Sequence, residues 1–429
     1  MALNFAHGSV QWLAANAIGT IYTVSGLPFE PKALRFYWVG IQSNSPTNAV
    51  SAALNENRGV GFAVSTASRR AIGSFNQNAS AAANCGVIAT NIAIAVTVDG
   101  NGAITGSLDL NTITTTGFTL IVDDTAPVNI TVFYEAWGGD DITDASIGDI
   151  AEPAAIGTQN YTANGFTSDG SNQVVMFAGC QSTAALGTGQ ANDSGICVGF
   201  ATHNDTTQNV TVCGNSDDGS ATMDTDGYCI QGECLSMITV AGGNPSARAT
   251  LNGYADNQFS LNWITRATTN RRYIYLAIKG GSWRSSSLTI NANTLNATST
   301  VSILPFNVRG FSLVGRGSVT QTAGVSVVND EFSFGSASSI TSRNSVGILD
   351  ENATANVEID TIIRYDSVLS YPTNAGAVSE LLDVNSINVN TFSLRVDVAG
   401  GVANEWVGYL TFGDQRKPRT ISVGHPTII

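Results

Sequence analysis

Val174-Val-Met-Phe-Ala-Gly-Cys-Gln-Ser182 is the stretch that decides the fold, because its pattern occurs three times in the chain. The same frame reads Leu34-Arg-Phe-Tyr-Trp-Val-Gly-Ile-Gln-Ser43 near the start and Gly310-Phe-Ser-Leu-Val-Gly-Arg-Gly-Ser318 near the end. Each copy is an apolar and aromatic run that ends in Gly and small polar residues, which is typical of a core strand entering a turn. The sequence therefore predicts three copies of one β-rich unit.

Further landmarks keep register with these runs. Gly-Phe-Ala at 61–63 recurs at 199–201 and, less closely, as Phe-Ser-Phe-Gly at 332–335. Phe-Thr-Leu or Phe-Ser-Leu follows at 118–120, 259–261 and 392–394. The spacing predicts an internal triplication, which divides the chain into an N-terminal arm, three domains and a C-terminal tail: 1–18, 19–140, 158–281, 296–414 and 415–429.

Composition favours β-structure in all three copies. Charged residues make up only 12% of the chain and Gly alone accounts for 44 residues, whereas long helices need Glu, Lys, Gln and Arg on their exposed faces. Asp99-Gly-Asn-Gly102 between two apolar runs is a strong hairpin signal. We therefore expect an all-β protein with three tandem β-sandwich domains of jelly-roll-like type.

Net charge limits the classes of partner. The formal charge of −14 argues against sequence-independent binding of nucleic acid and against docking on anionic membranes. The N-terminus has no signal-peptide pattern, and no apolar run approaches the length of a membrane span.

Five of the six cysteines lie in the second copy and none lies in the third. If disulfides held the shared fold together, the third copy would carry them too, so we interpret the thiols as small buried apolar groups in a reducing compartment. A Cys229–Cys234 or Cys213–Cys229 bridge is the alternative.

No catalytic constellation is evident, and the chain is expected not to be an enzyme. The sequence has no Walker A loop, no dinucleotide-binding fingerprint and no His-Glu-x-x-His motif. Only three histidines are present (His7, His203 and His425), and two of them lie in terminal segments. Paired carboxylates such as Asp123-Asp124 fall in expected turns, so no cofactor and no catalytic residue is predicted.

One acidic stretch is a candidate cation site. Thr222, Asp224, Asp226 and Glu233 occupy positions 1, 3, 5 and 12 of a calcium-loop frame, with Gly227 at position 6. Thr at the first position and an apolar residue at the ninth depart from that frame. An acidic surface loop is the alternative interpretation.

The N-terminal segment carries three apolar anchors in a polar context, Phe5, Trp12 and Leu13. They either pack back on the first domain or form an arm that binds a neighbouring protein, and both alternatives stay open.

Two stretches of the first copy resemble structural proteins of tailed-phage particles: Val24-Ser-Gly-Leu-Pro-Phe-Glu-Pro-Lys-Ala-Leu-Arg-Phe-Tyr-Trp-Val-Gly40 and Arg58-Gly-Val-Gly-Phe62. The later Gly-Phe-Thr-Leu and Tyr-x-Ala landmarks add to the resemblance, which extends faintly to the third copy. It implies a β-sandwich module and a place in a virion assembled in the host cytoplasm. It brings no catalytic residues with it.

Two functions follow as hypotheses. The first is a capsid decoration or cement protein that binds the outer capsid surface, with the major capsid protein as partner. Three fused copies would mimic a trimer at a three-fold position, so the chain acts as a pseudo-three-fold monomer or a homo-oligomer. The alternative is a tail fibre or tip protein that binds host glycans through aromatic residues, which otherwise belong to the core: Trp137, Trp263, Trp283 and Tyr254. A polysaccharide hydrolase is a third class, but no residue pair nominates its acid and base.

Overall fold

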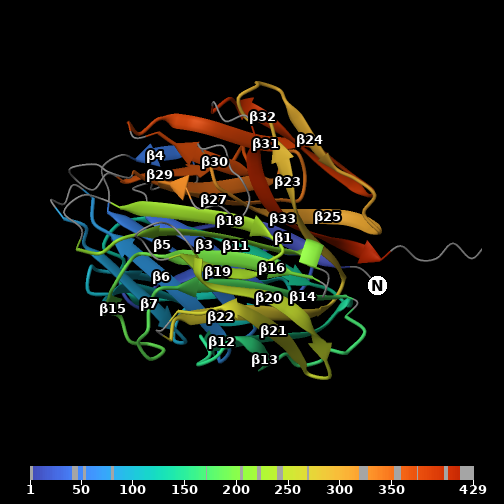
Figure 1. Cartoon of the computed structure of the whole chain (residues 1–429), viewed down its shortest axis with the longest axis horizontal. Helices are drawn as coiled ribbons and strands as arrows, with labels where there is room; N and C mark the ends of the chain where they lie inside the picture. Colours follow the sequence, from blue (N-terminus) through green and yellow to red (C-terminus); the bar gives the residue numbers. More distant parts are fainter. Residues whose placement is uncertain are drawn as a thin grey trace, which may run out of the picture.

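The computed structural model describes residues 3–40, 47–51, 55–78, 82–170, 172–202, 206–219, 224–238, 245–267, 270–317, 327–351, 359–373, 375–400 and 404–415. Within these ranges the regular structure consists of β-strands, apart from one turn of 3-10 helix, η1 (Thr206–Gln208). The expected all-β class is confirmed (Figure 1).

The strands form three units with the same strand order, each with one seven-stranded and one four-stranded sheet. In the first unit the seven-stranded sheet has the order β1 (Asn4–Trp12), β11 (Ile130–Gly138), β3 (Pro31–Gly40), β5 (Glu56–Ala63), β6 (Arg69–Asn76), β7 (Cys85–Thr90) and β15 (Gln190–Ala191). Its four-stranded sheet has the order β2 (Ile21–Ser25), β10 (Gly117–Asp124), β9 (Ile104–Thr114) and β8 (Ala95–Val98).

The second and third units repeat this order. The large sheet of the second unit is β12 (Ile142–Ala151), β22 (Arg272–Gly280), β14 (Gln173–Cys180), β16 (Ile196–Ala201), β17 (Asn209–Ser216), β18 (Thr225–Gln231) and β26 (Val327–Val328). Its small sheet is β13 (Gly157–Thr162), β21 (Gln258–Thr265), β20 (Pro245–Ala255) and β19 (Leu235–Ile238). The large sheet of the third unit is β23 (Ser282–Ile290), β33 (Glu405–Gln415), β25 (Phe306–Gly315), β27 (Asp330–Ala337), β28 (Arg343–Asp350), β29 (Ile359–Arg364) and β4 (Ala49–Ser51). Its small sheet is β24 (Thr298–Val301), β32 (Thr391–Val398), β31 (Val378–Asn388) and β30 (Leu369–Pro372).

Each unit is a β-sandwich with its own apolar core between the two sheets. In the first unit the ring of Phe36 on β3 lies 6.0 Å from that of Phe118 on β10. The strand order differs from a jelly roll, which is built from two Greek keys. Here β5, β6 and β7 are neighbours in one sheet and β8, β9 and β10 in the other, because short hairpins keep consecutive strands side by side.

The three units exchange strands in a closed ring. β4 belongs to the first unit's stretch of chain but pairs with β29 of the third unit. β15 of the second stretch pairs with β7 of the first unit, and β26 of the third stretch pairs with β18 of the second. Each exchanged strand covers a sheet edge that would otherwise be open to further pairing. The ring gives the chain a three-fold pseudo-symmetry.

A shared apolar core lies where the three large sheets face one another. Its members come from all three units, and Val60, Val198 and Phe334 hold equivalent places in it. Across the unit boundaries, the ring of Trp137 lies 6.2 Å from that of Trp283. The described residues therefore form four large apolar cores, one inside each sandwich and one between them, beside a small cluster of Ala83, Cys85 and Ile359.

The units begin earlier than the sequence predicted. The expected arm contains β1, and the stretches left between the predicted domains, 141–157 and 282–295, contain β12 and β23. These three strands hold equivalent edge positions, paired with β11, β22 and β33. Their sequences share no pattern because an edge strand is only half buried and its outward residues are free to vary.

Strand pairing also corrects one landmark. Phe62 and Phe200 lie opposite Arg35 and Met176, and the matching residue opposite Ser312 is Ser336 rather than Phe334. The predicted match of Phe334 with Phe62 is therefore off by two residues. A shift of two residues keeps a side chain on the same face of a strand, so the apolar pattern still agrees.

Candidate functional site

A buried polar cluster lies at the end of the shared core where the exchanged strands run. Arg58 on β5 is its centre: its Nε lies 2.5 Å from Glu56 Oε1, and its Nη2 lies 2.5 Å from Asp330 Oδ2 on β27 of the third unit. The same Nη2 donates to the carbonyl oxygen of Ser194, from the second unit, at 3.2 Å. One guanidinium thus joins all three units.

Asp350 on β28 extends the cluster. It accepts hydrogen bonds from Ser216 Oγ at 2.7 Å and from Asn76 Nδ2 at 3.3 Å, which again come from the other two units. Strand pairing shows that Asn76 and Asp350 hold equivalent places opposite Glu56 and Asp330. The cluster therefore assembles matching positions around the pseudo-three-fold axis.

The electrostatics of the cluster follow from its burial. Burial raises the pKa of Asp350 to about 6, against the opposing field of Arg58. Burial likewise raises the pKa of Glu56 well above its ordinary value. These residues and Asp330 are at most 1% exposed. Because this cluster is sealed from solvent, it connects the three units and is not accessible to a ligand.

A second polar contact crosses the shared core. Arg35 Nε lies 2.7 Å from Glu135 Oε2, and Ser312 Oγ of the third unit donates to Glu135 Oε1 at 2.7 Å. The guanidinium carbon of Arg35 lies 5.4 Å from the ring centre of Phe200, from the second unit. Burial raises the pKa of Glu135, and Arg35 opposes that rise.

No sequence motif predicts either contact, although Arg35 and Arg58 both lie in the stretches that resemble phage proteins. A usable signal was present, because charged residues inside strands of a chain with only 12% charged residues are unusual.

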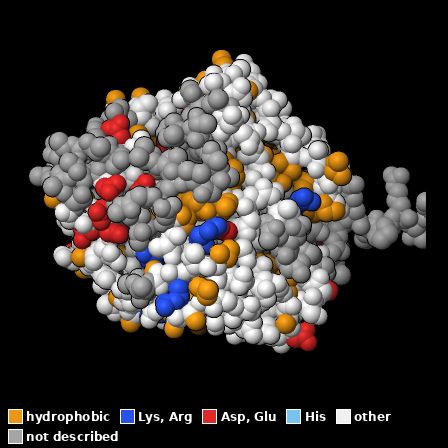
Figure 2. All heavy atoms as spheres, in the orientation of Figure 1, with side chains coloured by type: hydrophobic (Ala, Val, Ile, Leu, Met, Phe, Trp, Pro, Cys, Tyr) orange, Lys and Arg blue, Asp and Glu red, His pale blue; other side chains and the backbone are white. Residues whose placement is uncertain are grey.

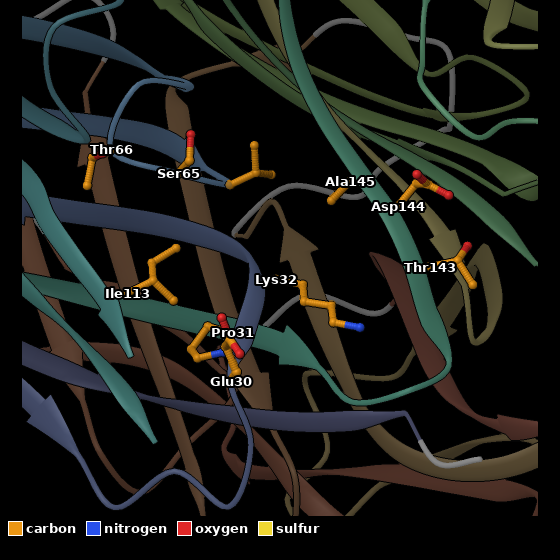
Figure 3. Close-up of a pocket in the computed structure, with 10 residues that line it drawn as sticks. Glu30, Pro31, Lys32, Ser65, Thr66, Ile113, Thr143, Asp144 and Ala145 are labelled. Carbon is orange, nitrogen blue, oxygen red and sulfur yellow. The ribbon is translucent and has the colours of Figure 1, made fainter. Parts of the chain in front are cut away.

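An open groove of about 530 Å³ marks the outer seam between the first and second units (Figure 3). Its walls include Lys32 of β3, Ile113 at the end of β9 and Asp144 of β12. The ammonium of Lys32 donates to the carbonyl oxygens of Ile142 at 2.7 Å and Gly139 at 3.0 Å. This side chain therefore ties β3 to the start of the second unit.

The four residues of the candidate calcium loop have separate environments where they are described. Glu233 binds the guanidinium of Arg248 and accepts from Ser236 Oγ at 2.7 Å. Asp226 is buried within β18, and Thr222 lies outside the described residues. Asp224 accepts a hydrogen bond from a backbone amide through its carbonyl oxygen. Across the described ranges, no group of three or more His, Cys, Asp or Glu is placed to hold a metal.

The three predicted partner-binding residues pack within the chain. The ring of Phe5 lies 4.5 Å from that of Phe412, and Trp12 is fully buried in the core of the first sandwich. The backbone amide of Leu13 donates to Tyr22 Oη at 3.0 Å. Trp12 thus packs back on the first domain, whereas Phe5 lies between Trp137 of the first unit and Phe412 of the third.

The four aromatic residues considered for glycan stacking belong to apolar cores. Trp137, Trp263 and Trp283 are all buried, and Tyr254 packs edge-on against Phe166 at 5.4 Å. The three tryptophan rings are therefore not accessible to a sugar, whereas Tyr254 is half-buried.

All six cysteines are buried and free, so neither of the two suggested bridges is formed. His7 is the histidine within the described residues, and its ring contacts Ser342 and Asn344. Burial lowers its pKa to about 4, so the ring is neutral at physiological pH.

Comparisons with known proteins give no family for this chain. No protein-family model and no curated protein matches it. Among solved structures, a fructofuranosidase from Schwanniomyces occidentalis, complexed with fructose, aligns with 92% of this chain and 98% of its own, at 7% identity and a TM-score of 0.14. A likeness at this level carries no argument. In the described ranges, no helix is long and apolar enough to cross a membrane.

Proposed function

We propose that this chain is a non-enzymatic structural protein of a phage particle, which binds the outer capsid surface at a position of three-fold or quasi-three-fold symmetry. The observation that carries the proposal is the closed ring of strand exchange among three units of equal strand order. The resemblance of Val24–Gly40 and Arg58–Phe62 to virion proteins supports the same class.

The physical argument rests on matching symmetry. A three-fold position on a particle presents the same surface three times, and a pseudo-three-fold ligand meets all three copies at once. Linked contacts of this kind raise the overall affinity far above that of a single contact. A rigid ligand also loses little conformational entropy on binding.

Rigidity follows from how the units are joined. The shared core and Arg58 each connect all three units, and the Arg35–Glu135 pair does so together, since Arg35 lies over Phe200 of the second unit and Glu135 accepts from Ser312 of the third. Both guanidinium groups are buried. Ring closure within one chain makes the assembled state independent of protein concentration. We therefore expect a monomer in solution that binds as a preformed three-fold body, with the major capsid protein as its partner.

The test uses heads of the phage that encodes the chain, prepared without it. The purified chain is mixed with these heads, co-sedimented and imaged by cryo-electron microscopy. We expect density of this size on three-fold or quasi-three-fold positions of the outer shell. Binding to the tail alone, or no binding to the particle, would contradict the proposal.

A further inference from the structure

Two buried glutamates face each other inside the third sandwich. Glu380 lies on β31 of the small sheet and Glu405 begins β33 of the large sheet, and both are at most 1% exposed. Tyr371, opposite Glu380 on β30, donates from its hydroxyl to Glu405 Oε1 at 2.6 Å. We call Glu380 and Glu405 the carboxyl pair. With Tyr371 it connects the two sheets of this unit.

The carboxyl pair is tightly enclosed. A Cβ at Gly315 would overlap the hydroxyl of Tyr371, and one at Gly400 would overlap the carboxyl of Glu380. Acidic side chains at the surface, such as those on the face shown in Figure 2, are in contact with water. Because the carboxyl pair is packed against backbone instead, a negative charge there loses its hydration, which is costly.

No cation neutralises the carboxyl pair within the described part of the chain. Three titratable groups interact with it, and each would add negative charge if it ionised: Glu331 on β27, Tyr371 on β30 and Cys229 on β18 of the second unit. Arg316 interacts with Glu331 and not with the carboxyl pair. Two adjacent carboxylates without a cation repel each other, so one of them keeps its proton and donates it to the other.

The pKa values of these groups agree with a shared proton. Burial raises the pKa of Glu405 to about 7, although hydrogen bonds from Glu380 and Tyr371 lower it. Burial and the charge of Glu405 raise the pKa of Glu380 far above its ordinary value of 4.5. Burial also raises the pKa of Tyr371, so its hydroxyl stays a donor. The carboxyl pair therefore holds at least one proton at neutral pH.

The first and second units have different residues at the places of Tyr371 and Glu380. Strand pairing puts Thr97 opposite Gly106 at these places in the first unit. In the second unit the same places are held by an apolar pair, Met237 and Ala247. Neither unit has a carboxyl group there.

Glu405 has no acidic counterpart either. It lies four residues before Tyr409, whose ring packs edge-on against that of Phe392 at 5.4 Å. The equivalent ring pairs in the other units are Phe118–Tyr134 and Phe259–Tyr275. Four residues before those tyrosines the chain has Ile130 and Arg271. The carboxyl pair is thus a feature of the third unit alone.

We propose that the proton shared by Glu380 and Glu405 holds the two sheets of the third sandwich together, so that this unit opens at alkaline pH while the other two stay closed. Opening exposes both carboxyl groups to water, where they ionise. A carboxyl whose pKa is raised by folding contributes its full stability below its ordinary pKa of 4.5, and this contribution is lost as the pH rises. Each proton released on opening favours the open form about tenfold per pH unit. The inference is independent of the partner proposed above.

The test is hydrogen exchange of the full chain, followed by mass spectrometry at pH 6 and pH 8 and corrected for the intrinsic exchange rate. We expect the protection of β31 and β32 to fall about a hundredfold or more between these pH values, since opening releases at least one proton. The protection of β9 and β10 in the first unit should change less than about tenfold. Equal changes in the two units, or no change in either, would overturn the inference.

Two variants test the shared proton itself. Glu380→Gln replaces it with a permanent donor, because an amide Nε2 donates to the carboxylate of Glu405. Its β31 and β32 should be better protected at pH 8 than those of the unmodified chain. The matched control is Glu135→Gln, at a fully buried glutamate paired with Arg35, and should leave the pH response of β31 and β32 unchanged. A Glu380 variant with the pH response of the unmodified chain would contradict the shared proton. If either variant fails to fold, the comparison of units in the unmodified chain still decides.

Discussion

Replacing Arg58 with methionine tests whether the buried polar cluster holds the three units together. The substitution keeps a long side chain but leaves Glu56 and Asp330 without the cation that both contact at 2.5 Å. Removing one partner of a buried ion pair costs about 3–5 kcal/mol, because the remaining charge stays buried. The free energy of unfolding should fall by that amount near neutral pH.

The pH dependence of the loss gives a second readout. Asp350 has a folded-state pKa of about 6 against an ordinary value of 3.8, so the folded state binds this proton more tightly than the unfolded state. Its stabilising contribution is complete below about pH 4 and is lost as the pH rises through 6. Arg58 opposes that loss, so the variant should be far less stable at pH 8 and closer to the unmodified chain at pH 5.

The assay is urea unfolding followed by tryptophan fluorescence at pH 8 and pH 5. Arg70→Met is the matched control, since Arg70 of the first unit pairs with Asp149 of the second at the surface, at 3.1 Å. An exposed pair contributes about 0–1 kcal/mol. Equal losses in the two variants, or a loss in the Arg58 variant that does not change with pH, would refute the argument.

Three further predictions concern backbone and thiols. Ile303 is 83% exposed and has φ 61°, at the place where the first unit has Gly26. Ile303→Gly should therefore raise the free energy of unfolding by about 1 kcal/mol, whereas Gly26→Ala should lower it by a similar amount. Urea midpoints that move the other way would count against this. A Cβ at Gly61 would overlap the carbonyl oxygen of Ile94. Gly61→Ala should therefore lower the free energy of unfolding by about 3 kcal/mol in urea. A neutral effect would show that β5 can move away from the segment that carries Ile94. Burial raises the pKa of the Cys180 thiol to about 12, and all six cysteines are buried. A colorimetric thiol reagent at pH 8 should therefore react with the cysteines only after unfolding. Rapid reaction of the folded chain would contradict their burial.

The landmarks that sequence comparison located best are those that pack inside a sandwich. Phe118, Phe259 and Phe392 are each the second residue of the equivalent strand, and each lies in the core of its own unit. Gly61 and Gly199 recur because each passes close to a backbone carbonyl, where no side chain fits. Such positions tolerate few residue types, so they stay visible after the copies diverge.

The candidate site was less accessible to sequence reasoning. The calcium-loop pattern depends only on spacing along the chain, whereas Glu233, in the loop between β18 and β19, pairs with Arg248 on β20. The buried cluster draws residues from β5, β17 and β27, and no local pattern indicates that these strands meet. Contacts between units depend on pairs of residues far apart in the chain, where one sequence carries no periodic signal.

The sequence by itself determined the all-β class, the strands of each sandwich core and the threefold recurrence of their landmarks. The alternation of buried residues and the glycine turns are local properties of each strand. Only the tertiary structure decided that edge strands open each unit, that β4, β15 and β26 pass to neighbouring units, and that one apolar core lies among the three large sheets. A strand exposes the same unpaired backbone groups whichever edge it joins, so its partner is fixed by how the units pack around the axis and not by its own residues.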